Sequence, residues 1–595
     1  MEYPKYRLFD SINHQLKNFP KENTLNAKIN GEWKSFSSQY IHDITNKLAA
    51  ALYQKNISGK NFTVEACDKI AIISANRPEW VFVDLAVQKT GAVLIPIYPT
   101  TGEKELAFIL NESEAKYIFV GDAGLLDKVK SVNSPHLKDI YSFDTLEGCK
   151  HYSELVNEAT DSSISDIIQY AETIPHTHIA TIIYTSGTTG VPKGVMLAHE
   201  NIVSNIYFSK ASFPFPDQPQ TRVLSFLPLN HIFEKMITYL YLFSGIGIYY
   251  AESIEKIGDN LKELKVDGFT TVPRLLEKVY EKIMAKGNEL TGFKRSLFFW
   301  SVNIGKQYDI NKSGGFLYDL KLKIANALIF TKWREALGGN ISFIITGGAA
   351  ASEKLLRIFN AAKIPIYEGY GPTENSPVIC VNRFTKGGSE LGTVGPPIDG
   401  IEVKLAEDNE ILVKGASVMR GYYKRQDLTD DVIKDGWLYT GDIGTWIDNK
   451  YIKITDRKKE LLKTSGGKYV APQPIENKLK ESRFIEQVIV VGDDKKFVSA
   501  LIVPSFTALQ SWVKEKEIDI STDNASIIKS KDVIDLIQHE IDRANINFNH
   551  VEQVKKFALL PAEWSIEGGE MTPKLSLKRK IILEKYSHYI DNIYE

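Results

Sequence analysis

Short runs of β-branched residues alternate with helix-like stretches between residues 69 and 121 of this 595-residue chain. Strands are predicted at KIAIISA (69–75), AVLIPIY (92–98) and KYIFVG (116–121), with helices through PEWVFVDLAVQKTG and from Gly102 to Asn111. This alternation is typical of an α/β protein whose parallel strands are buried on both faces. Further strands are expected at ATIIYTS (180–186), ISFIITGG (341–348) and IPIYEGYG (364–371).

The pattern changes after about Thr393 to the shorter strands IEVKLA, EILVKG and YIKIT, separated by PP, DG, DN and GD pairs. A basic stretch, DRKKELLKTSGGK (456–468), follows, and then QVIVVG and FVSALIVP. We predict a large N-terminal α/β domain over 1–455, with a β-rich subdomain over about 393–455. A small C-terminal α/β domain is predicted over 456–595, with the boundary near Asp456.

The composition is that of an average globular protein, with 43% hydrophobic and 25% charged residues. The 72 basic and 74 acidic residues nearly cancel, so no overall field attracts nucleic acid or an anionic membrane. Cys67, Cys149 and Cys380 lie far apart, which argues against a disulfide framework or a zinc site and fits a reducing cytoplasm. Because apolar runs stay well short of about 18 residues, we expect a cytoplasmic protein, peripheral to a membrane at most.

The segment YTSGTTGVPKGV (184–195) follows a predicted strand and combines hydroxyl side chains, glycines and one lysine. Glycines let backbone amides converge on an anion, hydroxyls donate hydrogen bonds to phosphate oxygens, and the lysine adds a mobile positive charge. The Walker A pattern does not fit, because Gly194 and Val195 follow Lys193. The alternative is a surface loop of the same composition. The residues predicted to bind a triphosphate are Thr185, Ser186, Gly187, Thr188, Thr189, Gly190 and Lys193.

This segment resembles the signature of the adenylate-forming, or AMP-binding, superfamily, which includes acyl-CoA synthetases, luciferase-like enzymes and peptide-synthetase adenylation domains. The likeness extends over nearly the whole chain, because other family motifs follow in their expected order. SANRPEW (74–80) and QKTGAVLIPIYPT (88–100) are similar to early core motifs, and we interpret both as structural. ANRPEW, YEGYGPTENSPV and RSLFFWSVNIGKQY (295–308) resemble bacterial long-chain fatty acyl-CoA synthetases most closely.

TGGAA (346–350) and YEGYGPTENSP (367–377) predict a slot in which a flat base stacks beside an aromatic ring. Thr373 offers a hydroxyl to the α-phosphate, and Glu374 offers a hard oxygen ligand to Mg²⁺. A Gly/Pro turn capped by these two residues is the alternative. The other residues predicted to contact AMP or ATP here are Gly347, Gly348, Ala349, Glu368, Gly369, Tyr370 and Gly371.

Two further motifs contain residues that the resemblance makes candidates for the active site. LPLNHIFEK (227–235) resembles the motif whose histidine lies where acyl group and pantetheine meet, which makes His231 a catalytic candidate and a core histidine the alternative. Many long-chain members have arginine where Lys235 stands. In DGWLYTGDIG (435–444), the Asp442 carboxylate could accept hydrogen bonds from both ribose hydroxyls, and the resemblance makes it the ribose ligand.

The basic stretch and the C-terminus complete the series. TDRKKELLKTSGGKYVAP (455–472) resembles the family's hinge, so Asp456 and Lys459 are predicted hinge residues and Arg457 a ribose or phosphate contact. A solvated run of charges is the alternative. MTPKLSLKRKII (571–582) resembles the motif with the lysine of the adenylation step, although Leu577 replaces the usual glycine. Lys578 is our assignment, Lys574 and Lys580 are its rivals, and a basic tail helix is the alternative.

The resemblance implies a ligase that activates a fatty acid, with long chains expected, as an acyl-adenylate and transfers it to coenzyme A. ATP, Mg²⁺ and coenzyme A are the expected cofactor and co-substrates, the C-terminal domain would be a mobile lid, and Lys578, Thr373, His231 and Lys193 would be catalytic. An aryl-acid, amino-acid or acyl-AMP ligase and a catalytically inactive binding protein are the alternatives. The apolar segment 239–250 could line an acyl tunnel or be ordinary core. Chain length, a homodimer and membrane contact stay open.

Overall fold

The strands predicted between residues 69 and 121 form the middle of one sheet in the computed structural model, which describes residues 2–186, 191–213, 215, 220–521, 523–572 and 576–595. The strand order is β18-β9-β8-β4-β3-β5-β6-β7. Every residue of β3, β4 and β5 is buried and these strands are parallel, as predicted. The strands are β3 (Lys69–Ile73), β4 (Val93–Ile97), β5 (Tyr117–Val120), β6 (Asp139–Ser142), β7 (Lys150–His151), β8 (Ile179–Ser186), β9 (Pro192–Ala198) and β18 (Gly421–Tyr422).

A second sheet has the order β15-β14-β13-β12-β10-β11-β1-β2. Its middle strands are again parallel, so their carboxyl ends share one edge of the sheet. The strands are β1 (Leu25–Ile29), β2 (Glu32–Phe36), β10 (Arg222–Ser225), β11 (Gly247–Tyr250), β12 (Gly268–Thr271), β13 (Phe343–Thr346), β14 (Ile366–Tyr370) and β15 (Cys380–Val381).

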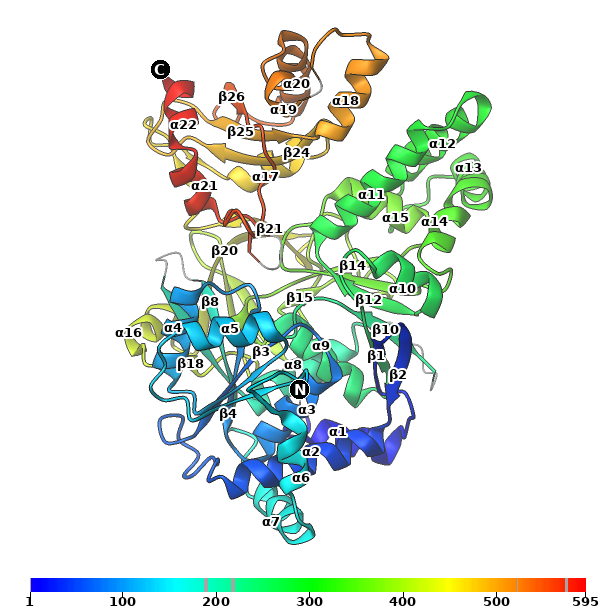
Figure 1. The fold of residues 1–595 in the computed structure, drawn as a ribbon. Coiled ribbons are helices and arrows are strands. Elements are labelled where there is room, and N and C mark those ends of the chain that lie inside the picture. Colours follow the sequence, from blue (N-terminus) through cyan, green and yellow to red (C-terminus); the bar gives the residue numbers. More distant parts are fainter. Residues whose placement is uncertain (1, 187–190, 214, 216–219, 522, 573–575) are drawn as a thin grey trace.

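Helices cover the faces of both sheets, and α3 (Pro78–Lys89), the helix predicted at PEWVFVDLAVQK, is buried along its whole length. In Figure 1, α11, α12 and α13 project from the body as an arm. The other helices of the large domain are α1 (Asp10–Asn18), α2 (Ser38–Gln54), α4 (Glu103–Ser113), α5 (Ala123–Ser131), α6 (Tyr152–Glu158), α7 (Asp161–Glu172), α8 (His199–Lys210), α9 (Ile232–Phe243), α10 (Ile257–Leu264), α11 (Pro273–Asn288), α12 (Gly292–Lys306), α13 (Phe316–Ala325), the π-helix η1 (Asn326–Phe330), α14 (Thr331–Ala336), α15 (Glu353–Ala361), the 3₁₀ helix η2 (Thr373–Asn375) and α16 (Gln426–Val432).

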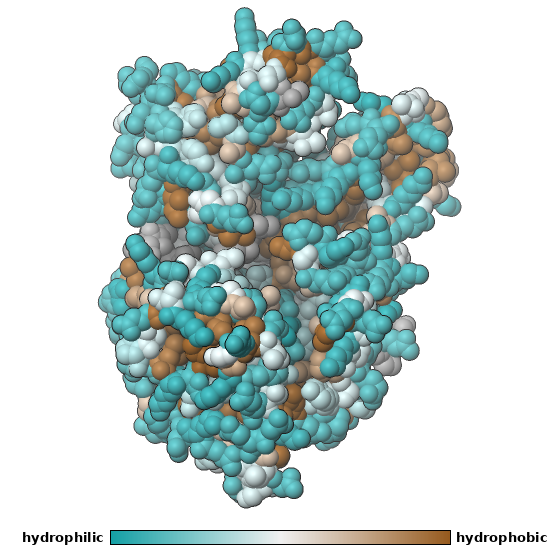
Figure 2. Space-filling view, viewed as in Figure 1, coloured by the Kyte–Doolittle hydropathy of each residue, from teal (hydrophilic) through white to brown (hydrophobic). Residues whose placement is uncertain are grey.

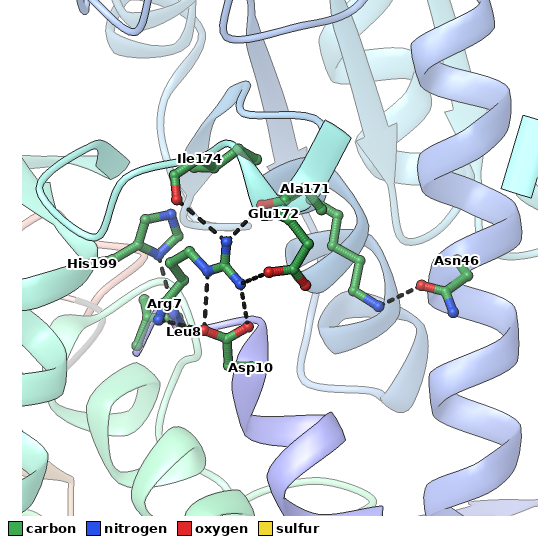
Figure 3. Close-up of polar contacts among 9 residues, drawn as sticks. Arg7, Leu8, Asp10, Asn46, Ala171, Glu172, Ile174 and His199 are labelled. Carbon is green, nitrogen blue, oxygen red and sulfur yellow. Dashed lines mark hydrogen bonds and ion pairs between the residues drawn. The ribbon is translucent and has the colours of Figure 1, made fainter. Parts of the chain in front are cut away.

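Arg7 and Leu8 join the N-terminal segment to neighbouring helices of the large domain (Figure 3). Arg7 donates hydrogen bonds to the carbonyl oxygens of Ala171 (2.6 Å) and Ile174 (3.3 Å) and pairs with Asp10. The backbone N–H of Leu8 donates to Nδ1 of His199, 3.1 Å away. These bonds join α1 to α7 and α8 and satisfy polar groups that the surrounding core would otherwise leave unpaired.

The predicted β-rich subdomain is a sheet of order β16-β17-β20-β19, with β21 paired to β20. Its strand β21 continues through Asp456 to Arg457, so the predicted boundary falls at the end of a strand. The strands are β16 (Ile401–Leu405), β17 (Glu410–Gly415), β19 (Ile433–Lys434), β20 (Trp437–Ile447) and β21 (Tyr451–Arg457).

The C-terminal segment has its own hydrophobic core, whose members run from Leu462 to Ile593. It lies above the large domain in Figure 1 and contacts the arm through Arg274, which pairs with Glu486, and the neighbouring α15 through Lys354, which donates to the Glu481 carbonyl oxygen (2.7 Å). None of the described helices combines the length and the apolar character needed to cross a bilayer. The elements are β22 (Leu462–Lys463), β23 (Tyr469–Val470), β24 (Ile485–Val491), β25 (Ser499–Pro504), β26 (Lys556–Leu559), α17 (Pro472–Leu479), α18 (Phe506–Glu515), α19 (Asn524–Ile527), α20 (Lys531–Asn545), α21 (Arg579–Lys585) and α22 (Ser587–Tyr594).

Candidate active site

Of the predicted phosphate-binding residues, Thr185 lies in β8 and Lys193 in β9. The two strands are antiparallel, and Thr185 faces Lys193 across the ladder. The strand β9 therefore returns beside β8 as a hairpin pair and brings Lys193 next to the end of β8. The predicted residues Gly187, Thr188, Thr189 and Gly190 lie outside the described residues, as does the side chain of Ser186.

The predicted base-binding residues lie at the shared carboxyl edge of β13 and β14. Gly347 and Gly369 approach each other closely, because a Cβ on Gly347 would lie 3.2 Å from the Gly369 carbonyl oxygen. Glu368 is buried and accepts the N–H of Ala351 at 2.8 Å, and burial raises the pKa of its carboxyl to about 8. The predicted residues Gly348 and Ala349 are exposed at the same edge.

The predicted ribose ligand is held between an aromatic hydroxyl and a cation. Tyr370 donates its hydroxyl to Oδ2 of Asp442 at 2.7 Å, and Nε of Arg457 lies 3.3 Å from Oδ1. Asp442 and Arg457 are direct neighbours across β20 and β21. Burial raises the pKa of Asp442, and the Arg457 cation and the Tyr370 hydrogen bond oppose that rise. A carboxylate has about four acceptor positions, so Asp442 keeps acceptor capacity for a ligand.

The turn that follows β14 leaves no room for a side chain at its first residue. A Cβ on Gly371 would lie only 1.7 Å from the carbonyl oxygen of Pro377, which explains why glycine is required there. The turn leads into η2, where Thr373 is buried and Glu374 is half-buried. The predicted α-phosphate and magnesium ligands are thus neighbours on one short helix.

Tyr422 links Lys193 on β9 to this helix, and the sequence analysis did not identify it. Its hydroxyl donates to Oε1 of Glu374 at 2.8 Å, and the ammonium of Lys193 lies 5.0 Å from the centre of its ring. The pairing of β18 with β9 puts Tyr422 directly opposite Val195. The GYYK sequence carries no motif for this role, because the contact depends on pairing between strands more than 220 residues apart.

Lys193 lies among other charges of the site. Burial lowers the pKa of its ammonium, the Lys459 cation lowers it further, and Glu374 opposes the shift. The predicted hinge residue Lys459 is therefore close enough to Lys193 for the two charges to interact. Two cations and one carboxylate beside the ends of β8 and β9 favour the binding of a polyphosphate.

A magnesium ion fits this donor set when a nucleotide is present. Among the described residues, His, Cys, Asp and Glu side chains form no cluster of three or more that could hold a metal alone. Mg²⁺ typically takes one or two carboxylates and completes its shell with substrate phosphates and water. The half-buried Glu374 meets that requirement.

His231 is the N-cap residue of α9, where its Nδ1 accepts the N–H of Phe233 at 3.2 Å. It is half-buried and makes an N-cap hydrogen bond, so its catalytic role stays a prediction beside the alternative of a core histidine. The Phe233 ring lies 3.8 Å from the position of a Cβ on Gly347, so α9 begins beside the base-binding edge. Lys235, in contrast, is buried and paired with Asp84 in the core.

The predicted hinge begins with a buried carboxylate. Asp456 is fully buried, and its two oxygens accept the N–H groups of Arg457 (2.6 Å) and Gln473 (3.0 Å). Burial raises the pKa of Asp456 to about 6. Lys458 pairs with Asp408 (2.5 Å) and Glu410 (2.8 Å) on the β-rich sheet. The charges of Arg457 and Lys458 in the run 456–459 are thus paired, but both side chains are largely exposed, so the hinge stays a prediction.

The predicted adenylation lysine faces the large domain. Lys578 occupies the N-cap position of α21 without a capping side-chain hydrogen bond, and its cation opposes the rise that burial causes in the pKa of Glu105 on α4. That helix packs on β8, with the Phe108 and Tyr184 ring centres 6.4 Å apart. The side chain of its rival Lys580 is 67% exposed, which makes Lys580 a weaker candidate for the adenylation lysine. The other rival, Lys574, lies outside the described residues.

Comparison with known sequences identifies the family. The AMP-binding enzyme family matches residues 12–423, and the AMP-binding enzyme C-terminal domain matches residues 459–595. The chain belongs to the AMP-binding enzyme family. The predicted resemblance and the predicted α/β fold class are thereby confirmed.

Curated relatives of this AMP-binding enzyme include long-chain-fatty-acid–CoA ligases. It is 32% identical over 536 residues to the ligase FadD15 of Mycobacterium bovis, covering 89% of this chain and 88% of the relative. It is 32% identical over 601 residues to long-chain-fatty-acid–CoA ligase 1 of Homo sapiens, covering 95% of this chain and 82% of the relative.

Solved structures of other AMP-binding enzymes share the fold. The Mycobacterium tuberculosis fatty acyl CoA synthetase superposes with a TM-score of 0.63 at 19% identity, and each chain is covered to 98%. The anthranilate CoA ligase AuaEII in complex with anthranoyl-AMP superposes with a TM-score of 0.71 at 16% identity, again with 98% coverage of both chains. At these identities the likeness concerns the fold alone.

Three parts of this AMP-binding enzyme therefore meet at one site: the β8–β9 hairpin, the edge of β13 and β14, and the start of the C-terminal segment. The segment 239–250 lies elsewhere, in α9 and β11, and its aromatic side chains Tyr239, Tyr241 and Tyr250 are buried in the main core. Its packing supports the interpretation as ordinary core.

Proposed function

We propose that this AMP-binding enzyme is an AMP-forming acid–thiol ligase that activates a fatty acid, with a preference for long chains, and transfers it to coenzyme A. The observation that carries the proposal is the grouping of Lys193, Glu374 and the Asp442–Arg457 pair around one position, which supplies phosphate, metal and ribose contacts together. The names of the curated relatives support the choice of substrate class.

In the first step, an oxygen of the substrate carboxylate attacks the α-phosphorus of ATP. A bond forms between this oxygen and the α-phosphorus. The bond from the α-phosphorus to the oxygen that bridges it to the β-phosphate breaks, and pyrophosphate leaves. In the second step, the thiol of coenzyme A loses its proton and attacks the acyl carbon, and AMP leaves as a thioester bond forms. Neither step requires a nucleophile from the protein.

Catalysis then rests on position and charge neutralisation. Lys193 and Lys578 would oppose the charge that gathers on the phosphates, and Thr373 would donate its hydroxyl to the α-phosphate. Glu374 would hold Mg²⁺, which shields the phosphates when bound. Asp442 and Arg457 would fix the ribose. Loss of one such cation should cost on the order of 3 kcal/mol, or about a hundredfold in rate.

The test is pyrophosphate release with a series of acids from acetate to oleate, with and without coenzyme A. Turnover that depends on palmitate or oleate and on coenzyme A supports the proposal. Preference for benzoates or amino acids would indicate a different acid class, and release without dependence on coenzyme A would indicate an acyl-AMP ligase. Absence of release with every acid would indicate a binding protein without catalysis.

Lys578→Ala separates the two steps. Because Lys578 is proposed to act only in adenylation, the variant should lose pyrophosphate release by about a hundredfold and still convert preformed acyl-adenylate to thioester. Lys580→Ala is the matched control, since its side chain is exposed on the same helix. An equal loss in both half-reactions would contradict the assignment of Lys578 and the lid function of the predicted domain 456–595.

A further inference from the structure

The arm of the large domain carries exposed apolar side chains. Among the described residues, 18 large apolar side chains are exposed, and six of them lie between residues 293 and 328. Figure 2 shows hydrophobic atoms at the outer edge of this arm, and Figure 1 shows that it projects from the body. The six are Phe293 (80% exposed), Phe316 (81%), Leu317 (70%), Leu320 (47%), Ile324 (40%) and Leu328 (50%).

Five of these residues form a stripe along the continuous helix α13–η1–α14. Phe316, Leu320, Ile324 and Leu328 follow one another at intervals of four, and Leu317 lies beside them. We call these five residues the arm stripe. The inward face of the helix is apolar as well, with Ala325, Phe330 and Trp333 packed in the core. The helix therefore has two apolar faces, and its own fold buries only one of them.

Two lysines flank the arm stripe, and the arm as a whole is basic. Residues 292–336 contain eight Lys or Arg and three Asp or Glu, whereas the whole chain has a net charge of −2. At 100° per residue, Lys321 and Lys323 lie on opposite sides of the stripe, and both are exposed. The other exposed basic residues of this region include Lys294, Arg295, Lys312 and Lys332.

We propose that the arm stripe is a docking surface for an anionic lipid bilayer. A helix with an exposed apolar face and flanking lysines lies in the plane of a membrane interface, with its apolar side chains below the headgroups and its cations beside the lipid phosphates. The charge decides between this occupant and a second copy of the chain. A self-association through the stripe would bring two basic surfaces together, whereas anionic headgroups complement them.

Sedimentation with phospholipid vesicles tests the proposal. The wild-type protein should bind phosphatidylcholine vesicles that contain phosphatidylglycerol, and should bind pure phosphatidylcholine vesicles much less. Lys321→Gln combined with Lys323→Gln should weaken binding roughly 30-fold, since two basic residues lose their attraction to the surface. Phe316→Ser and Leu317→Ser should each weaken it at least about tenfold. Ile546→Ser, which changes an equally exposed side chain (81%) in the C-terminal domain, should leave binding unchanged.

Three results would overturn the proposal. The first is absence of vesicle binding by the wild type, and the second is equal binding by the stripe variants and Ile546→Ser. The third is a change of molecular mass in solution caused by Phe316→Ser, which would make the stripe a self-association surface. Vesicle binding needs neither ATP nor turnover, so its failure is distinguishable from failure of the proposed reaction. Because the changed side chains are exposed and lie outside the candidate site, all variants should retain the wild-type melting temperature and the wild-type activity on a water-soluble acid without vesicles.

Discussion

Tyr422→Phe isolates the contribution of a single hydroxyl to the candidate active site. The hydroxyl donates to Glu374 at 2.8 Å, and the ring, which phenylalanine retains, lies below Lys193 at 5.0 Å. A hydrogen bond to a charged group contributes about 1.5–3 kcal/mol, and water can replace part of it because Glu374 is only half-buried. We expect a loss of about 1–2 kcal/mol, which corresponds to roughly 5- to 30-fold in rate.

The assay is pyrophosphate release as a function of Mg²⁺ and ATP concentration. If Tyr422 orients the proposed metal ligand, Tyr422→Phe should raise the Mg²⁺ concentration needed for half-maximal rate and lower the maximal rate of adenylation. Thioester formation from preformed acyl-adenylate should change little. Tyr451→Phe is the matched control, because Tyr451 is equally buried (6%) and donates its hydroxyl to the carbonyl oxygen of Gly387 (2.5 Å). Equal effects of the two variants, or an unchanged Mg²⁺ dependence, would refute the role of Tyr422.

Two further predictions concern stability. Glu234 is fully buried between the hydroxyls of Ser225 and Thr270, each 2.6 Å away, and burial raises the pKa of its carboxyl from 4.5 to about 7. The neutral Glu234 carboxyl is favoured in the folded state, so its contribution to the free energy of unfolding is complete below pH 4.5. This contribution is lost as the pH rises through 7, a change on the order of 3 kcal/mol. Glu234→Gln should therefore raise the melting temperature more at about pH 8 than at about pH 5, and a pH-independent difference would contradict this. Gly371→Ala should destabilise the large domain by about 1–3 kcal/mol or more, because the new Cβ would lie 1.7 Å from a carbonyl oxygen. Gly258→Ala is the control and should not destabilise the protein, because the space around Gly258 is open. Equal melting temperatures for the two variants would count against the clash at Gly371.

The sequence predicted those parts of the fold that depend on local patterns. The runs at 69–75, 92–98 and 116–121 became β3, β4 and β5, because strands buried on both faces need continuous apolar residues. The order in which strands join sheets was not predictable. For example, β1 pairs with β11 although more than 200 residues separate them, and no local pattern records such pairing.

The candidate site shows the same division. Motifs indicated Lys193, Glu374 and Asp442, because glycines, hydroxyls and carboxylates that follow predicted strands can be recognised in a sequence. Tyr422 was missed, because an aromatic residue in a short strand has no chemical signature until its hydroxyl is seen beside Glu374. The arm stripe was missed as well. Its apolar residues have the spacing of an ordinary buried helix face, and only the structure shows which face is left outside.

The cross-strand pair of Asp442 and Arg457 has a consequence for the order of events during turnover. Arg457 is the last residue of β21, and the predicted hinge residue Asp456 directly precedes it. The proposed ribose contact and the start of the predicted hinge are therefore consecutive residues of one strand. Any rotation at 456–459 would therefore involve Arg457, which we propose contacts the ribose. Nucleotide affinity and domain orientation would then be thermodynamically linked, and each would shift the other by the same factor. Departure of AMP would in that case reset the enzyme for the next ATP without a separate signal.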